Sequence, residues 1–290
     1  MKLIKYFLEF FFIIILFIIF KIIGYKNSSN LGEIFGKSVG PIFRSKQKIQ
    51  SNLQNARIVK TEKDINNLIS SMWGNYGRIL SEYLYLKSFR DNSLSKFISI
   101  SGSEILDEIK KNNEQVVFIS GHFNNFELMA MEIDKFGIKC AAIYRPLNNI
   151  FLNPLMEYLR MKYICPNQIP KGRMGMREII QKVKNGYSVA LMVDQRVSEA
   201  PREVFFNKPA HTTTIPAQLA LKYNCKLVPI SLERKEGVKF LMTVHEPYKI
   251  NKTSDNKLDT KNITLKINQT LEQMVIKNPT QWIWSHNRWK

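Results

Sequence analysis

One of the four histidines in the sequence, His122, has the surroundings expected of a catalytic base. It follows an apolar run over residues 116–119 and a Ser-Gly pair, which predicts a strand that ends in a turn just before it. Open α/β sheets bind their ligands at the carboxyl ends of their strands. Glu127 stands five residues on, near the start of the next expected helix. Its carboxylate is therefore a candidate to orient the imidazole and to stabilise its positive charge.

The spacing of His122 and Glu127 is a weak signal by itself. The chain holds 24 acidic residues in 290 positions, so an acid at this distance from one of four histidines arises readily by chance. The alternative to a catalytic pair is a structural role for both residues. The ring of His122 would then form its hydrogen bonds within the turn, and Glu127 would be a favourable negative charge at the beginning of a helix.

Other polar residues are expected at the same edge of the sheet. Arg145 follows an apolar run and could bind a phosphate or stabilise an oxyanion, or it could form a surface salt bridge. Asp194 and Gln195 end another apolar run, although Asp194 could equally cap the turn. Arg173 is a weaker candidate for binding a phosphate.

Strands and helices are expected to alternate along most of the chain. A long amphipathic helix is predicted from Thr61 to about Phe89, and a last helix over 261–277, after a charged loop at 251–260. This alternation implies right-handed crossovers, and hence an α/β fold with a largely parallel sheet flanked by helices on both faces. Apolar strands are predicted at 116–119, 140–143, 188–193 and 226–230, with helices over 103–111, up to Phe136, from Asn153, from Met174 to about Gly186, and from Ile215.

The amino terminus is expected to be a transmembrane helix. Residues 3–23 are mostly apolar, and as a helix they extend about 31 Å, enough to cross the hydrocarbon core. No small-residue cleavage site follows, which favours a retained anchor over a signal peptide. The predicted organisation is an anchor over 1–26, a basic, membrane-proximal linker over 27–60, and a catalytic domain over 61–290.

The net charge predicts an anionic partner. The chain has 43 Lys and Arg against 24 Asp and Glu, a formal net charge of +19. The excess of basic residues after the apolar segment places the catalytic body in the cytoplasm. The three cysteines form no C-x-x-C pair, which agrees with a reducing compartment.

No metal and no cofactor are expected, since neither a metal-ligand cluster nor a G-x-G-x-x-G motif or P-loop is visible.

Six short blocks follow one another along the chain: G-H-F-N-N-F-E at 121–127, Y-R-P-L-N-N at 144–149, V-D-Q at 193–195, F-F-N-K-P-A at 205–210, V-P at 228–229 and W-I-W-S-H-N-R-W at 282–289. Together they resemble the late acyltransferases of lipid A biosynthesis, the lauroyl and myristoyl transferases with an H-x4-[DE] motif. One position departs from the family pattern, because Asn207 stands where these proteins usually have glycine. Asparagine is the other residue that best tolerates a positive φ, so the turn is expected to survive.

This resemblance implies an O-acyltransferase of the inner membrane, with a single membrane span and a cytoplasmic catalytic domain. It would move a fatty acyl chain from acyl carrier protein to a hydroxyl of a lipid A precursor, with His122 as the general base and Glu127 assisting. The residues expected to bind the substrate, from these blocks and from the strand ends, are Arg145, Asn148, Arg173, Asp194 and Gln195. The sequence has no G-x-S-x-G elbow, which favours direct transfer over a covalent acyl-enzyme.

Two other functions are compatible with the sequence. One is a related acyltransferase that acts on a lysophospholipid or a phosphatidylinositol mannoside. The other is a membrane-tethered basic binding module, for which nucleic acid is not expected as the partner, because the basic residues are dispersed rather than interleaved with aromatic ones. The sequence does not specify the acyl-chain length, the hydroxyl that is acylated, the order of acylation steps, the choice of acyl carrier protein or coenzyme A as donor, or the oligomeric state.

Overall fold

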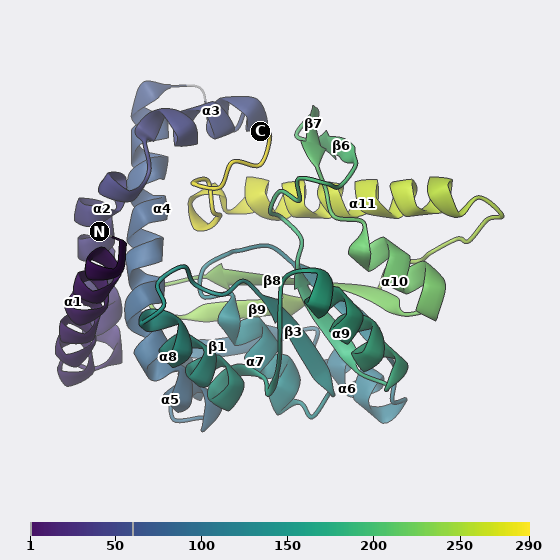
Figure 1. The fold of residues 1–290 in the computed structure, drawn as a ribbon, viewed down its shortest axis with the longest axis horizontal. Helices are drawn as coiled ribbons and strands as arrows, with labels where there is room; N and C mark the ends of the chain where they lie inside the picture. Colours follow the sequence, from purple (N-terminus) through teal and green to yellow (C-terminus); the bar gives the residue numbers. More distant parts are fainter. Residues whose placement is uncertain (1, 60) are drawn as a thin grey trace.

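The computed structural model describes residues 2–59 and 61–290 and contains a seven-stranded sheet between two layers of helices (Figure 1). The strand order is β1-β9-β8-β2-β5-β3-β4, and neighbouring strands are parallel except for β8 and β9. The strands are β1 (Ile98–Ser101), β2 (Val116–Ser120), β3 (Cys140–Tyr144), β4 (Asn167–Pro170), β5 (Ser188–Met192), β8 (Lys226–Arg234) and β9 (Phe240–Val244).

The predicted α/β class is confirmed, and the four strands expected from apolar runs correspond to β2, β3, β5 and β8. These strands are buried on both faces, so they stand out as continuous apolar runs. The sequence analysis missed β1, β4 and β9. The first two have only four residues each and lie at the two edges of the sheet, where a run of apolar residues is not required.

Two hydrophobic cores cover the two faces of the sheet. Along β2, Val117 and Ile119 belong to one core, whereas Val116 and Phe118 belong to the other. The first core includes residues of α3 (Lys46–Ala56), α4 (Glu62–Glu82), α9 (Arg173–Lys184), α10 (Ile215–Tyr223) and α11 (Asn256–Lys277). The second includes residues of α5 (Leu86–Arg90), α6 (Ser103–Lys111), α7 (Glu127–Lys135) and α8 (Leu152–Leu159).

The segment predicted to be a linker over 27–60 is largely helical in its described part. It holds most of α2 (Tyr25–Phe43) and all of α3, while Lys60 lies outside the described residues. The α2 helix packs closely on α4, and a Cβ atom at Gly77 would collide with the carbonyl oxygen of Gly32. Glycines that permit such close packing carry no hydrophobic signal, which explains why the polar, small-residue sequence suggested a linker.

The last long helix begins earlier than expected. The predicted start was Lys261, whereas α11 begins at Asn256. The side chain of Asp255 accepts hydrogen bonds from the backbone N–H groups of Lys257 and Leu258, and so caps the helix within the expected loop.

A separate two-stranded hairpin carries the position where the family pattern has glycine. Strands β6 (Arg202–Phe205) and β7 (Lys208–His211) are antiparallel and are joined by Phe206 and Asn207. Both connecting residues have positive φ angles, 51° and 57°, as a two-residue hairpin turn requires. Asparagine thus occupies the left-handed conformation that the departure from glycine put in question.

Candidate active site

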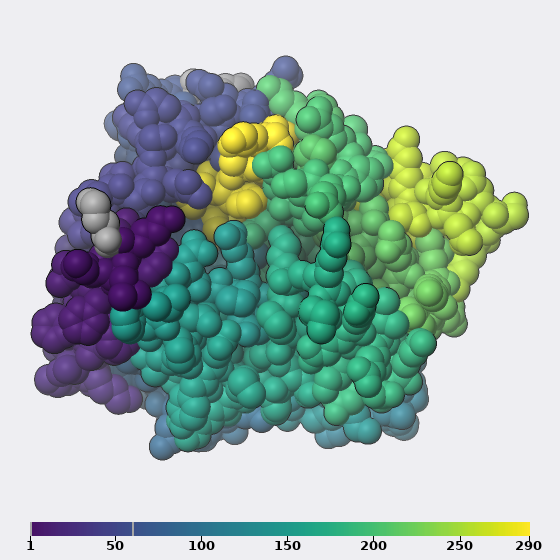
Figure 2. Space-filling model, viewed as in Figure 1, coloured from purple at the N-terminus to yellow at the C-terminus, as the bar shows by residue number. Residues whose placement is uncertain are grey.

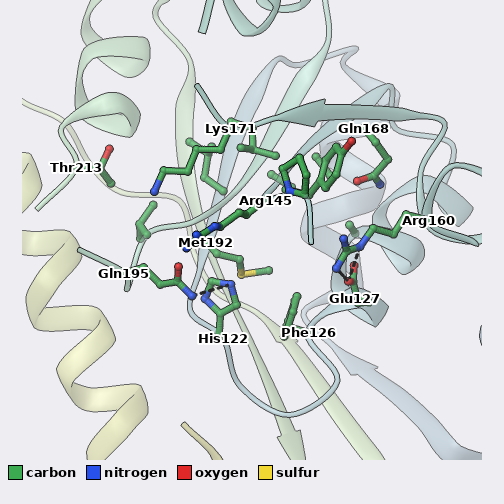
Figure 3. A pocket seen from close by; sticks show the side chains of 18 of the residues that line it. His122, Phe126, Glu127, Arg145, Arg160, Gln168, Lys171, Met192, Gln195 and Thr213 are labelled. Carbon is green, nitrogen blue, oxygen red and sulfur yellow. Dashed lines mark hydrogen bonds and ion pairs between the residues drawn. The ribbon is translucent and has the colours of Figure 1, made fainter. Parts of the chain in front are cut away.

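A cavity of about 530 Å³ opens near the carboxyl ends of β2, β3 and β5 (Figure 3). It contains five of the expected residues and several others that the sequence analysis did not identify. The expected ones in its lining are His122, Glu127, Arg145, Asn148 and Gln195. Asp194 lies behind His122 rather than in the lining, and Arg173 is exposed at the start of α9, away from the cavity.

The side-chain partner of His122 is Asp194. The His122 Nδ1 atom lies 2.7 Å from Asp194 Oδ1, and the His122 backbone N–H donates to Asp194 Oδ2 over 2.8 Å. The indole N–H of Trp282 donates to Asp194 Oδ2, also over 2.8 Å. At Gly121, a Cβ atom would lie 3.2 Å from Asp194 Oδ2 and 2.8 Å from the ring of Phe123, so glycine permits this close approach.

The environment of Asp194 keeps its side chain ionised. Burial by itself would raise the pKa of this carboxyl, but the adjacent imidazole and the hydrogen bonds from His122 and Trp282 lower it to about 2. A carboxylate at this position favours the tautomer of His122 that carries its proton on Nδ1. The Nε2 atom, 3.4 Å from the side-chain amide of Gln195, is then unprotonated and able to accept a proton.

Glu127 is bound to Arg160 instead. Its Oε1 atom accepts hydrogen bonds from Arg160 Nε, at 2.8 Å, and from the hydroxyl of Tyr83, and it lies 2.6 Å from Arg160 Nη2. Within the described residues, no hydrogen bond or ion pair joins Glu127 to His122. The ring of Phe126 stands edge-on to the imidazole, with 4.8 Å between the ring centroids (Figure 3). The expected contact between His122 and Glu127 is therefore replaced by two separate pairs on one cavity wall.

Arg160 gave no signal in the sequence analysis. It begins a π-helical turn, η3 (Arg160–Ile164), directly after α8, and its side chain is only 10% exposed. Burial alone would lower the pKa of Arg160, but Glu127 and Tyr83 raise it, so the guanidinium stays charged. Only the packing of η3 against α7, 33 residues earlier, brings Arg160 to Glu127.

Basic side chains line the opposite part of the cavity. Arg145 follows β3, and Lys171 follows the neighbouring strand β4. Burial and the proximity of Arg145 lower the pKa of Lys171, as expected of two cations that face each other. Arg44, which ends α2, lies in the same lining. In the part of the chain that the structure describes, none of these three cations forms an ion pair, so they are available to an anion.

The carboxyl-terminal segment closes the site from behind. His286 lines the cavity, and its Nε2 accepts the backbone N–H of Arg196 at 2.9 Å. Burial lowers the pKa of His286 to about 4, with further contributions from the charges of His122 and Arg288, although Asp194 opposes the shift. Arg288 is fully buried and binds the Thr212 hydroxyl over 2.8 Å. These contacts identify the aromatic tail as part of the core.

Among residues 2–59 and 61–290, no group of three His, Cys, Asp or Glu side chains is placed to hold a metal ion. The fold and the cavity define an α/β protein that has an apolar amino-terminal helix, α1 (Lys2–Ile22), with a part-buried His-Asp pair and a buried Glu-Arg pair at the carboxyl edge of its sheet.

Comparison with known proteins identifies the family. The profile described as bacterial lipid A biosynthesis acyltransferase matches residues 1–290, and the chain belongs to this family. It is 28% identical over 186 residues to lipid A biosynthesis acyltransferase 2 of Shigella flexneri, covering 63% of this chain and 58% of that protein. It is 23% identical over 268 residues to the lipid A biosynthesis lauroyltransferase of Escherichia coli, covering 90% of this chain and 84% of that one.

A third relative is the lipid A biosynthesis myristoyltransferase of Escherichia coli, 24% identical over 187 residues, which are 63% of this chain and 56% of that protein. The chain thus spans somewhat over half the length of several curated relatives that it matches, and most of the length of others.

Proposed function

We propose that this protein transfers a fatty acyl chain from an acyl carrier protein thioester to a hydroxyl of a lipid A precursor, at the cytoplasmic face of the inner membrane. The observation that carries the proposal is the His122-Asp194 pair on the wall of a large cavity with unpaired cations opposite. The family and the names of its curated members supply the reaction class and the acceptor.

In this mechanism His122 is the general base. Its Nε2 removes the proton from the acceptor hydroxyl while that oxygen attacks the thioester carbonyl carbon. The new C–O bond forms, the C–S bond breaks, and the thiolate of the carrier leaves and takes up the proton from the imidazolium. Between these two proton transfers Asp194 stabilises the imidazolium, because a fixed, buried carboxylate interacts strongly with a charge 2.7 Å away.

Glu127 acts through Arg160 in this proposal. A buried Glu127 carboxylate holds the guanidinium of Arg160 at the cavity wall, where a positive charge stabilises the oxyanion of the tetrahedral intermediate. Arg160 Nη1 is buried and has no hydrogen-bond partner among the described residues, so the guanidinium keeps one donor that these residues leave unsatisfied. In this proposal the partner of the base is Asp194, and not Glu127 as first predicted.

The remaining lining suits an anionic amphiphile. Arg145, Lys171 and Arg44 offer positive charge to the phosphates of a lipid A precursor, and Asn148 and Gln195 offer polar contacts to its sugar hydroxyls. Apolar residues of the same lining provide a surface for the acyl chain: Phe126, Ala130, Ala142, Ala190 and Leu191. A lysophospholipid or phosphatidylinositol mannoside would use the same two surfaces, and these remain the alternative acceptors.

Transfer by the purified, full-length protein tests the proposal. With an acyl carrier protein thioester and an underacylated lipid A precursor, mass spectrometry should detect a product one acyl chain heavier. His122→Ala should lower the rate at least about a hundredfold, the usual contribution of a general base. His211→Ala is the matched control, because His211 lies on β7 outside the cavity lining. Transfer at the wild-type rate by folded His122→Ala protein would refute the proposed base.

A further inference from the structure

Helix α9 packs on the sheet by one face only. Gly175, Ile179 and Val183 are buried, and a Cβ atom at Gly175 would lie 1.9 Å from the carbonyl oxygen of Pro170, so glycine lets the helix approach β4 closely. In Figure 1 the helix lies on the near side of the sheet, and in Figure 2 its teal-green surface faces the viewer. The exposed residues form what we call the outer face of α9: Arg173, Met174, Arg177, Gln181 and Lys184.

The outer face of α9 is basic. The helix holds four cations and one acid in twelve residues, and it extends about 16 Å from Arg173 to Lys184. Within the described residues, Arg173, Arg177 and Lys184 form no ion pair. The sequence analysis expected Arg173 to bind a substrate phosphate, and the structure places it on this face instead. A row of exposed positive charge of this length attracts an extended acidic surface.

An apolar side chain and a groove lie among these charges. Met174 is 75% exposed, and together with Arg177 and Gln181 it lines a surface groove of about 530 Å³. Arginine and methionine are both enriched in protein–protein interfaces, and the flexible methionine side chain adapts to the shape of a partner. The outer face of α9 therefore has the composition of a surface that binds an acidic protein.

The outer face of α9 begins at the opening of the active-site cavity. Arg145 and Lys171 belong to the cavity lining and are nevertheless exposed, so they mark where the cavity meets solvent (Figure 3). The backbone N–H of Lys171 donates to the carbonyl oxygen of Tyr144 over 2.8 Å, which ties this segment to the end of β3. Arg173 follows Lys171 by two residues, so their Cα atoms are at most about 7 Å apart. A protein bound to α9 is thus beside the entrance through which a thioester reaches the cavity.

We propose that the outer face of α9 is the docking surface for the acyl carrier protein. The carrier is an acidic protein that holds the acyl group as a thioester on a flexible pantetheine arm. It lies along Arg177 and Lys184, with Met174 at the apolar centre of the contact, while the arm passes Lys171 to bring the thioester to His122. The inference rests on the carrier-protein donor of the proposed function and names the surface that receives this donor.

Charge reversal on α9 tests the docking surface. In the full-length protein, Arg177→Glu with Lys184→Glu should raise the Michaelis constant for the acyl carrier protein thioester at least about tenfold at 0.1 M salt, because like charges slow the encounter. Turnover at saturating donor should change little. The difference from the wild type should shrink at 1 M salt, where the Debye length is about 3 Å.

The matched control for this charge reversal is Lys257→Glu with Lys261→Glu, which makes the same change of charge at two exposed lysines of α11. Its Michaelis constant for the carrier thioester should stay close to that of the wild type. An unchanged constant in the α9 variant, or an equal rise in the α11 control, would overturn the proposal.

An acyl-pantetheine thioester separates the docking surface from the chemistry. This donor has the arm and the thioester but no carrier protein, so the wild type and the α9 variant should use it with the same Michaelis constant. A defect of the α9 variant with this small donor would mean that the substitutions disturb the cavity, and would contradict docking on α9. If the wild type transfers from neither donor, the proposed function fails. If the wild type uses the carrier thioester and the α9 variant uses it equally well, only the docking surface is wrong.

A photochemical cross-link maps the contact directly. Met174→Cys labelled with a benzophenone maleimide should trap the acyl carrier protein on illumination. The three native cysteines are at most 2% exposed, so the unmodified chain is the blank. Leu258→Cys, at an exposed leucine of α11, is the matched control and should trap much less. Equal trapping at the two positions, or trapping at Leu258→Cys alone, would refute docking on α9.

Vesicle binding separates the carrier protein from an anionic lipid surface as the partner of α9. The wild type and Arg177→Glu with Lys184→Glu should bind equally to vesicles of phosphatidylglycerol and phosphatidylethanolamine. Weaker vesicle binding by the variant, with an unchanged Michaelis constant for the carrier thioester, would assign the outer face of α9 to lipid, and the proposal would fail.

Discussion

The carboxylate of Asp194 hydrogen-bonds to both the ring and the backbone of His122. One of its oxygens lies 2.7 Å from Nδ1 and the other lies 2.8 Å from the backbone nitrogen. The two residues are 72 positions apart in the sequence, and the sheet brings them together. Ser120, the last residue of β2, pairs with Met192, the last residue of β5. The chain continues for two residues beyond each strand, to His122 and to Asp194. The register of two parallel strands therefore fixes the ring and its partner side by side.

Asp194→Asn should leave the fold intact and lower turnover by about a hundred- to ten-thousandfold, on the scale of general-base catalysis. The amide can donate a hydrogen bond to Nδ1, which favours the tautomer with its proton on Nε2 and so blocks the base. Turnover at saturating donor and acceptor, measured together with thermal unfolding, checks this. The matched variant Gln195→Ala, which alters the other neighbour of the ring, should lose much less turnover; equal losses would argue against the assigned role of Asp194.

Arg160→Met should destabilise the protein by about 3–5 kcal/mol, because it leaves the carboxylate of Glu127 buried without its charged partner. The double variant Glu127→Gln with Arg160→Met should recover part of that loss, since no uncompensated charge remains. Denaturant unfolding in detergent measures both free energies. If the double variant is less stable than Arg160→Met alone, the two side chains do not behave as a buried ion pair.

The sequence predicted the strands of the sheet centre and the residues at their ends, because both depend on local patterns. Continuous apolar runs indicated β2, β3, β5 and β8, and the polar residues after β2, β3 and β5 lie at the cavity or directly behind it. The pairing of those residues could not be predicted in the same way. It depends on strand order, and β5 lies between β2 and β3 in space although it follows β3 in the chain.

The missed residues show the same limitation. Nothing near Arg160 in the sequence indicates a site, because its partner Glu127 belongs to another helix. Glu127 was expected at His122 from its position five residues on, near the start of the next helix, and from the family resemblance. Trp282 was noted only as the first residue of the last sequence block, while its hydrogen bond to Asp194 spans 88 positions. A short motif gives the residue types of the site, and only the tertiary packing determines which of them touch.

Trp282→Phe should lower turnover while leaving the Michaelis constants close to those of the wild type. The phenyl ring fills most of the buried space but cannot donate to Asp194 Oδ2, so the carboxylate loses one of its three hydrogen bonds. Trp282 is thus a positioning residue that acts through Asp194. A pH profile of turnover distinguishes this from a packing defect, since a less well held carboxylate should shift the acidic limb. Trp284→Phe is the control, because its indole N–H donates to the carbonyl of Pro279 instead.

His286 should make the protein less stable as the pH falls from about 6.5 to about 4. Burial lowers the pKa of His286 in the folded protein to about 4, whereas in the unfolded chain it stays near the usual value of about 6.5. The unfolded state therefore binds a proton first, and stability falls by up to about 1.4 kcal/mol per pH unit in this window. His286→Gln keeps an acceptor for the Arg196 N–H and should flatten the slope. Unfolding free energies of both proteins at pH 7, 6, 5 and 4.5 provide the comparison, and parallel curves would contradict the shifted pKa.

The net charge of +19 predicts a strong effect of salt on the use of a protein donor. Acyl carrier protein is acidic, so its encounter with this basic surface should be steered electrostatically, and the Debye length falls from about 10 Å at 0.1 M salt to about 3 Å at 1 M. The Michaelis constant for the carrier-bound acyl group should therefore rise with salt while turnover changes little. An acyl-pantetheine thioester, which lacks the protein, is the control and should show a flat Michaelis constant. A constant that stays flat for both donors would mean that the carrier protein is not recognised through its charge, and would favour acyl coenzyme A or a phospholipid as the donor.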